Sequence, residues 1–192
     1  MTNRCLTRNP TYKYVTNFSL AYRSNSAPRP QPRLFALIIG INNYQSGDYP
    51  HLRGAVPDGK AFQVYLIERL GVPKNHISTL FDEQATRSAI IQAFRELSKD
   101  NRINEGDPIF IFYSGHGSQE FPHPDWELEE TKTMIEVIIP YDCTSDWRTS
   151  SPGTVQPIPD LTIGALIDEI ARTKGDNIVR PSTQLFVLTQ IV

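Results

Sequence analysis

Short apolar runs alternate with amphipathic stretches along most of this chain. The runs are rich in β-branched and aromatic residues, and polar or glycine-containing segments separate them. The continuous apolar run at residues 34–41 predicts a strand buried on both faces, as in a parallel sheet. The predicted strands cover residues 34–41, 76–81, 108–113 and 133–139.

Two stretches between these strands have helical periodicity. Pro57 suits the first turn of a helix over residues 57–70, and Gly71 lies just past its end. Thr86 is placed to cap a second helix. The apolar positions of that helix are Ala89, Ile90, Ala93, Phe94 and Leu97.

The order of the elements predicts the architecture. A third helix is expected from Asp160 or Thr162 to about residue 173, and polar loops are expected over residues 119–131 and around the prolines 157 and 159. Strands and helices that alternate in this way predict an α/β, three-layer sandwich with a mostly parallel central sheet. Right-handed crossovers then place helices on both faces of the sheet.

Residues 1–32 differ from the rest of the chain. They contain basic but no acidic residues and end in a proline-rich stretch, Ser-Ala-Pro-Arg-Pro-Gln-Pro. Such a segment buries little apolar surface, so we expect a disordered basic arm, with a mitochondrial transit peptide as the alternative. The folded domain is then expected over residues 33–178, with a separate tail at residues 179–192.

Composition narrows the class of protein. The 192 residues are 39% hydrophobic and 21% charged with a net charge of −2, which suits one globular domain and favours neither nucleic acid nor a membrane surface as a partner. Two cysteines, Cys5 and Cys143, do not make a disulfide framework. No apolar run reaches the roughly 18 residues of a membrane span, and no secretory signal is recognisable. We therefore expect a cytoplasmic location.

The third strand ends in Ser-Gly-His-Gly, which places His116 between two glycines. In open α/β sheets, ligands and catalytic groups lie at the carboxyl ends of the strands. The glycines allow a sharp turn and leave backbone N–H groups accessible. His116 is therefore the first candidate for a functional residue.

Six ordered motifs carry a family resemblance. They lie at residues 36–42, 52–58, 112–117, 138–142, 158–160 and 175–178. On these residues the chain resembles the caspase-like cysteine peptidases (peptidase C14), closest to the metacaspases and caspase-domain proteins of fungi. The resemblance implies a caspase-like fold and peptide-bond hydrolysis by a Cys–His pair.

The resemblance assigns roles to four residues. His116 matches the catalytic histidine, and the Gly117 amide matches the oxyanion donor. Asp58 and Ser114 match a pocket that binds an arginine or lysine before the scissile bond, although Ala55 stands where that pocket has a cysteine. Asp58 has a second interpretation as a carboxylate that stabilises a helix N-terminus. We expect His116 in a cleft bordered by Asp58 and Ser114.

The nucleophile of the family is missing. Its cysteine is expected soon after Ile178, but residues 179–192 contain none. Cys143 lies too close in sequence to His116 and is interpreted as a loop thiol, and Cys5 lies in the arm. The domain is therefore expected to be incomplete at its C-terminus and inactive as given. The abrupt change after Ile178 suggests a retained intron or an unfinished gene model.

Metal and cofactor sites are poorly matched. Calcium-regulated relatives cluster several carboxylates, because Ca²⁺ takes six or more oxygen ligands. Asp160 matches one of them, but Leu161 replaces its neighbour and Ile135 stands at another acidic position. A zinc site from His116 and His123 lacks further ligands. We expect no metal and no cofactor, with calcium possible only through the resemblance.

The sequence features bear on three candidate functions. The first is a caspase-like peptidase domain without its nucleophile, with peptides or proteins as substrates. The second is a non-catalytic pseudoenzyme that binds and regulates an active caspase-like relative or a client peptide. The third, a nucleotide-binding domain, is weak because the loop after the first strand lacks both Gly-x-Gly-x-x-Gly and a lysine-bearing phosphate loop.

Overall fold

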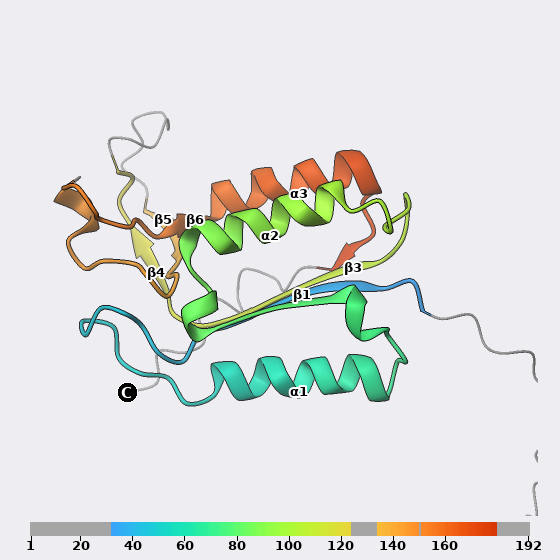
Figure 1. Cartoon of the computed structure of the whole chain (residues 1–192). Coiled ribbons are helices and arrows are strands. Elements are labelled where there is room, and N and C mark those ends of the chain that lie inside the picture. Colours follow the sequence, from blue (N-terminus) through green and yellow to red (C-terminus); the bar gives the residue numbers. More distant parts are fainter. Residues whose placement is uncertain (1–31, 124–133, 150, 180–192) are drawn as a thin grey trace, which may run out of the picture. The chain divides into compact units, whose positions relative to one another are not determined.

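The computed structural model describes residues 32–123, 134–149 and 151–179, and the structural statements below refer to these ranges (Figure 1). The basic arm at residues 1–32 lies outside them except for Pro32. The tail at residues 179–192 lies outside them except for Val179. In the described ranges no helix is long and apolar enough to cross a membrane.

A four-stranded parallel sheet forms the centre of the domain. Its strands are β1 (Phe35–Gly40), β2 (Ile77–Phe81), β3 (Ile109–Ser114) and β7 (Ile178–Val179). Their order is β2-β1-β3-β7, and every neighbouring pair is parallel. All six residues of β1 are buried, as expected for a strand covered on both faces. The predicted α/β class with a mostly parallel central sheet is confirmed.

Helices cover both faces of this sheet, as predicted (Figure 1). The helices are α1 (Ala55–Glu68), α2 (Arg87–Lys99) and α3 (Asp160–Lys174). Helix α1 lies on one face, while α2 and α3 lie side by side on the other. The side chains of β1 alternate accordingly: Leu37 and Ile39 pack toward α2 and α3, and Ala36 and Ile38 pack toward α1.

The helix ends follow their sequence signals with one shift. The Thr86 hydroxyl accepts a hydrogen bond from the Ala89 N–H at 3.2 Å, as its capping position predicted. Helix α1, however, begins two residues before Pro57. The side chain of Asn42 explains this earlier start, because its Oδ1 accepts the Val56 N–H at 3.1 Å and so satisfies a donor of the first turn.

A small antiparallel sheet corrects two loop predictions. It contains β4 (Gly117–Glu120), β5 (Ile135–Ile138) and β6 (Ile158–Pro159) in that order. Gln119 and Glu120 were expected in a loop but pair with β5, and Pro159 was expected in a loop but pairs with Val137. Neither segment has the alternation of apolar and polar residues that would predict a strand. Each is extended because it pairs with β5.

Candidate active site around His116

His116 lies between the two sheets, just after β3 and just before β4. Its backbone is held on both sides. The His116 N–H donates to the Tyr44 hydroxyl at 2.6 Å. The His116 carbonyl accepts the Tyr113 hydroxyl at 2.7 Å and the Ile139 N–H at 3.0 Å. These three bonds fix the direction in which the half-buried side chain leaves the backbone.

The imidazole of His116 has a defined hydrogen-bond partner. Its Nε2 lies 2.7 Å from the carbonyl oxygen of Pro50. A carbonyl can only accept, so Nε2 carries the proton of this bond, and Nδ1 is the ring nitrogen left to exchange a proton with a reactant. The ring of Tyr44 packs beside the imidazole with 4.9 Å between centroids. The geometry therefore suits a general acid or base that acts through Nδ1.

The hydroxyl groups of Tyr44 and Tyr113 form hydrogen bonds with the backbone of His116. Burial raises the pKa of both Tyr44 and Tyr113 above the usual tyrosine value, so both stay protonated and neutral. Gly115 leaves room for them. A Cβ at this position would lie 2.7 Å from the Tyr113 hydroxyl and 3.1 Å from the Tyr44 hydroxyl. The glycine before the histidine is therefore required by close packing.

Gly117 begins β4, which is one of the two edge strands of the antiparallel sheet. The Ile139 N–H donates to the His116 carbonyl, which makes the neighbouring Gly117–Ile138 pair a non-hydrogen-bonded pair of the ladder. At such a position the N–H points away from the partner strand. The Gly117 N–H therefore points off the open edge of the sheet, next to His116.

Ser114 and the start of helix α1 both lie against Gly40. Ser114 ends β3 and pairs with Gly40 at the end of β1. Helix α1 begins against the same glycine, since a Cβ on Gly40 would lie 2.9 Å from the Ala55 carbonyl oxygen. Asp58 is exposed in the first turn of α1. The structure thus has Ser114, His116 and Gly117 along one stretch of chain, and it places Asp58 in the first turn of the helix that starts close to Gly40.

Three contributors to the site were not predicted from the sequence: Tyr44, Tyr113 and the Pro50 carbonyl. Tyr44 and Pro50 lie in the loop after β1, which has no motif that relates it to a histidine more than sixty positions later. Any residue supplies a carbonyl, so Pro50 leaves no signal in its side chain. Tyr113 belongs to the apolar run and to the motif at residues 112–117, but the sequence assigns its hydroxyl no role.

Cys143 lies in the turn after β5 and is fully buried in the core. Its Sγ lies 3.3 Å from the Tyr49 hydroxyl. Burial raises the pKa of the Cys143 thiol to about 11, so a thiolate is scarce at neutral pH. These properties belong to a packed core thiol rather than to a nucleophile.

We expect Cys143 to react slowly with iodoacetamide in the native chain. At pH 8 its thiolate fraction is about two orders of magnitude below that of an ordinary thiol. The rate should still rise with pH above 9, whereas that of an ordinary thiol levels off. Between about pH 8.5 and 11 the native state should also lose stability, because the unfolded thiol ionises first. Mass spectrometry of Cys143 peptides, with the urea-unfolded chain and Cys143→Ser as controls, checks this. A plateau near pH 9 would contradict it.

Histidine and carboxylate side chains of the described ranges do not cluster around a common point. No group of three or more His, Cys, Asp or Glu side chains lies there in a position to hold a metal ion. The carboxylate of Asp160 accepts the N–H of Leu161 at 2.7 Å, in the first turn of α3. His123 is buried beside Trp147, with 5.8 Å between the ring centroids. Within these ranges Asp160 therefore belongs to no such group of side chains.

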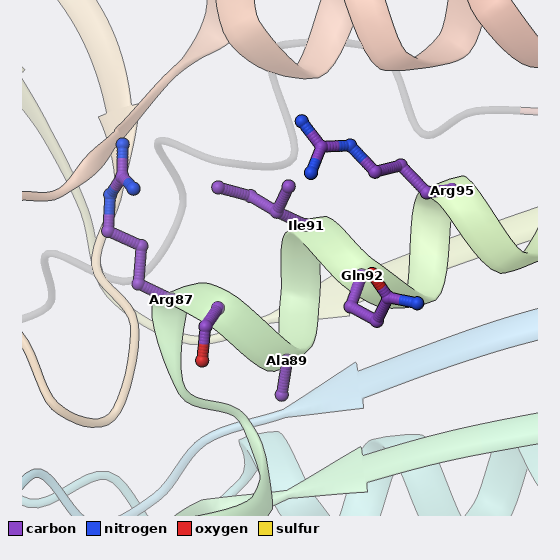
Figure 2. A pocket seen from close by; sticks show the side chains of 6 residues that line it. Arg87, Ala89, Ile91, Gln92 and Arg95 are labelled. Atoms are coloured by element: carbon purple, nitrogen blue, oxygen red, sulfur yellow. The ribbon is translucent and has the colours of Figure 1, made fainter.

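A separate hollow runs along α2 (Figure 2). It is lined by side chains of Arg87, Ser88, Ala89, Ile91, Gln92 and Arg95. The first-turn amides of the helix already have partners: Thr86 Oγ1 accepts one and Asp142 Oδ1 accepts the Arg87 N–H at 2.7 Å. None of the four predicted site residues lines this hollow.

Comparisons with known proteins agree on one family. The family model described as "Metacaspase, peptidase C14 domain" matches residues 35–156. The chain is 39% identical over 114 residues to a metacaspase-1A of Aspergillus oryzae and 36% identical over 113 residues to one of Aspergillus terreus. Each match covers 56% of this chain and about a quarter of the relative (25% and 26%), so the chain spans a small part of the length of these proteins.

Similarity to a solved bacterial structure supports the fold. The crystal structure of protein GSU0716 from Geobacter sulfurreducens is similar, with a TM-score of 0.53 and 25% sequence identity. The similarity covers 72% of this chain and 45% of the other.

Proposed function

The chain belongs to the metacaspase peptidase C14 domain family, and on that premise we propose that His116 serves a peptide-hydrolysing site to which these 192 residues contribute the histidine, an oxyanion donor and part of the substrate pocket. The observation that carries the proposal is the orientation of His116. The Pro50 carbonyl accepts the Nε2–H of His116, so Nδ1 is the nitrogen that faces the reactant. The Gly117 N–H lies beside the histidine and does not pair with β5.

The proposed reaction is acyl transfer to a thiolate. The thiol of a cysteine from outside these residues loses its proton to Nδ1 of His116 and attacks the scissile carbonyl. The Gly117 N–H donates to the oxygen on which negative charge develops. When the C–N bond breaks, the same proton passes from Nδ1 to the departing amine. Water then attacks the thioester, with His116 as the base, and releases the acid product and the thiol.

The substrate side is proposed to bind a peptide with arginine or lysine before the scissile bond. Asp58 is exposed, and in the described ranges neither its carboxylate nor the Ser114 hydroxyl forms a hydrogen bond. A carboxylate can accept two parallel hydrogen bonds from a guanidinium group, and a hydroxyl can complete the set. Acceptors without protein partners are suited to a basic side chain that arrives with the substrate.

The test separates binding from cleavage. Fluorescence anisotropy should detect binding of a labelled Arg- or Lys-terminated tetrapeptide amide but not of its Glu counterpart. Asp58→Asn should weaken this binding about tenfold, because a charge-assisted bond becomes a neutral one. Asp48→Asn, which changes an exposed carboxylate in the loop between β1 and α1, is the control. Equal binding of both peptides would refute the Arg/Lys preference.

The same chain should release no product from a fluorogenic Arg peptide. Without the nucleophile only a small part of the full rate enhancement remains. Activity that both His116→Ala and Cys143→Ala abolish would show that Cys143 is the nucleophile after all. Activity that neither substitution changes would come from a contaminant.

The alternative is a pseudoenzyme that regulates an active relative. The observation in favour of this role is the burial of Cys143. Cys143 is the cysteine of the described ranges, and its burial keeps the thiol from reacting with a substrate. Adding the purified chain to an active fungal metacaspase should then change the hydrolysis rate of that enzyme, and His116→Ala should not abolish the effect. An unchanged rate would exclude this role.

A further inference from the structure

One loop supplies both groups that orient the side chain of His116. Residues 41–54 connect β1 to α1 and carry Tyr44, which packs beside the imidazole, and Pro50, whose carbonyl accepts Nε2–H at 2.7 Å. The position of His116 therefore depends on what holds this loop. In the described ranges one carboxylate binds the start of this loop, and it belongs to the residue directly after strand β2.

This carboxylate anchor is Asp82. Its Oδ1 accepts two consecutive backbone N–H groups, those of Asn42 at 2.8 Å and of Asn43 at 2.9 Å. Tyr44 is the next residue along the chain. Two bonds to one carboxylate oxygen fix the orientation of both peptide units, and with them the point at which the Tyr44 side chain leaves the loop.

Asn42 extends the effect of this anchor to the rest of the loop. Its carbonyl accepts the Leu52 N–H at 2.8 Å, which ties the far end of the loop, two residues beyond Pro50, to its start. Its Oδ1 accepts the Val56 N–H at the beginning of α1. The residue that Asp82 holds is thus the junction between the Tyr44 side and the Pro50 side of the loop.

The backbone of Asp82 is itself unusual. Its φ is +46°, and it is the only residue other than glycine with a positive φ in the described ranges. The left-handed region is unfavourable for a side chain with a Cβ, and aspartate is among the few residues that enter it. A strained conformation that aims a carboxylate at two loop amides is the kind of feature that accumulates at functional sites.

We propose that Asp82 is a positioning residue for His116. It acts across the carboxyl edge of three adjacent strands: from the end of β2, through the loop after β1, to the histidine after β3. Its carboxylate holds the loop so that the Pro50 carbonyl captures Nε2–H and leaves Nδ1 toward the reactant. The catalytic meaning of this position rests on the function proposed above, but the orientation of His116 can be measured without any substrate.

The experiment measures the exchange of the His116 ring proton with water. In the ¹⁵N-histidine-labelled chain, the Nε2–H of His116 should give a protected signal, assigned by its absence in His116→Gln. Asp82→Gly removes the carboxylate and accepts φ +46° without strain. We expect ring-proton exchange to rise about tenfold or more in Asp82→Gly and in Asp82→Ala, because the bond to Pro50 is no longer held.

Two further variants separate positioning from general stability. Asp82→Asn keeps a side-chain oxygen that can accept the same amides and should restore most of the protection. Asp48→Ala removes another carboxylate, one that lies in the loop at residues 41–54 and accepts a hydrogen bond from Ser46. This substitution should leave the His116 signal unchanged. Amide exchange in β1, at Leu37, should stay the same in all variants.

The proposal is overturned if the His116 ring proton stays protected in Asp82→Gly and Asp82→Ala. It is also overturned if both variants unfold or lose protection at Leu37, since Asp82 would then be a structural residue. A change in His116 together with no binding of Arg peptides by the unaltered chain would leave the positioning role intact and refute the proposed function instead.

Discussion

Gly115→Ala should lower the free energy of unfolding by about 2–3 kcal/mol, because it places a methyl group where the two tyrosine hydroxyls lie. The new Cβ would be 2.7 Å from the Tyr113 hydroxyl. That hydroxyl cannot simply turn away, since it is buried and donates to the carbonyls of His116 and Ile139. Urea denaturation measures the change.

A matched glycine provides the control for this prediction. Gly164 lies within α3, and a Cβ there meets nothing within 4 Å. Gly164→Ala should therefore raise stability by about 0.5–1 kcal/mol through helix propensity. Tyr113→Phe combined with Gly115→Ala removes the hydroxyl that the methyl group meets. The pair should destabilise less than the sum of the single changes, and additive effects would disprove the proposed clash.

The strands and helices of the central layers could be predicted because their own residues specify them. Strand β1 is apolar at every position, which reports burial on both faces, and Thr86 marks the start of α2 with a capping side chain. The candidate histidine followed from the same pattern, since it comes directly after an apolar run. In these cases a local signal and the tertiary structure agree.

The remaining features depend on partners that are distant in sequence. Strand β4 is polar and is extended because β5 lies beside it. Asp82 resembles any acidic residue of a turn until its carboxylate is seen to reach Asn42 and Asn43, about forty positions earlier. The Pro50 carbonyl has no side-chain signature at all. The orientation of His116 is therefore a property of three loops that meet at one sheet edge, which no local pattern encodes.

Gly40→Ala tests whether the start of α1 must lie close to the end of β1. Its Cβ would lie 2.9 Å from the Ala55 carbonyl oxygen and 3.1 Å from Cδ1 of Phe81. The first of these atoms is backbone, so the helix itself has to move. We expect a loss of about 2–3 kcal/mol, or a fall in Tm of about 5–10 °C. Gly47→Ala, at an open loop position with nothing within 4 Å, should leave the Tm unchanged.

Movement of α1 should also weaken peptide binding, because Asp58 lies on α1 and Ser114 pairs with Gly40. The dissociation constant of the Arg peptide should therefore increase in Gly40→Ala. Leu97→Ala, a core change on α2 with a comparable loss of stability, should leave it unchanged. If both variants bind the peptide equally well, Asp58 does not belong to the pocket. The carboxylate would then serve only as a negative charge that stabilises the N-terminus of α1.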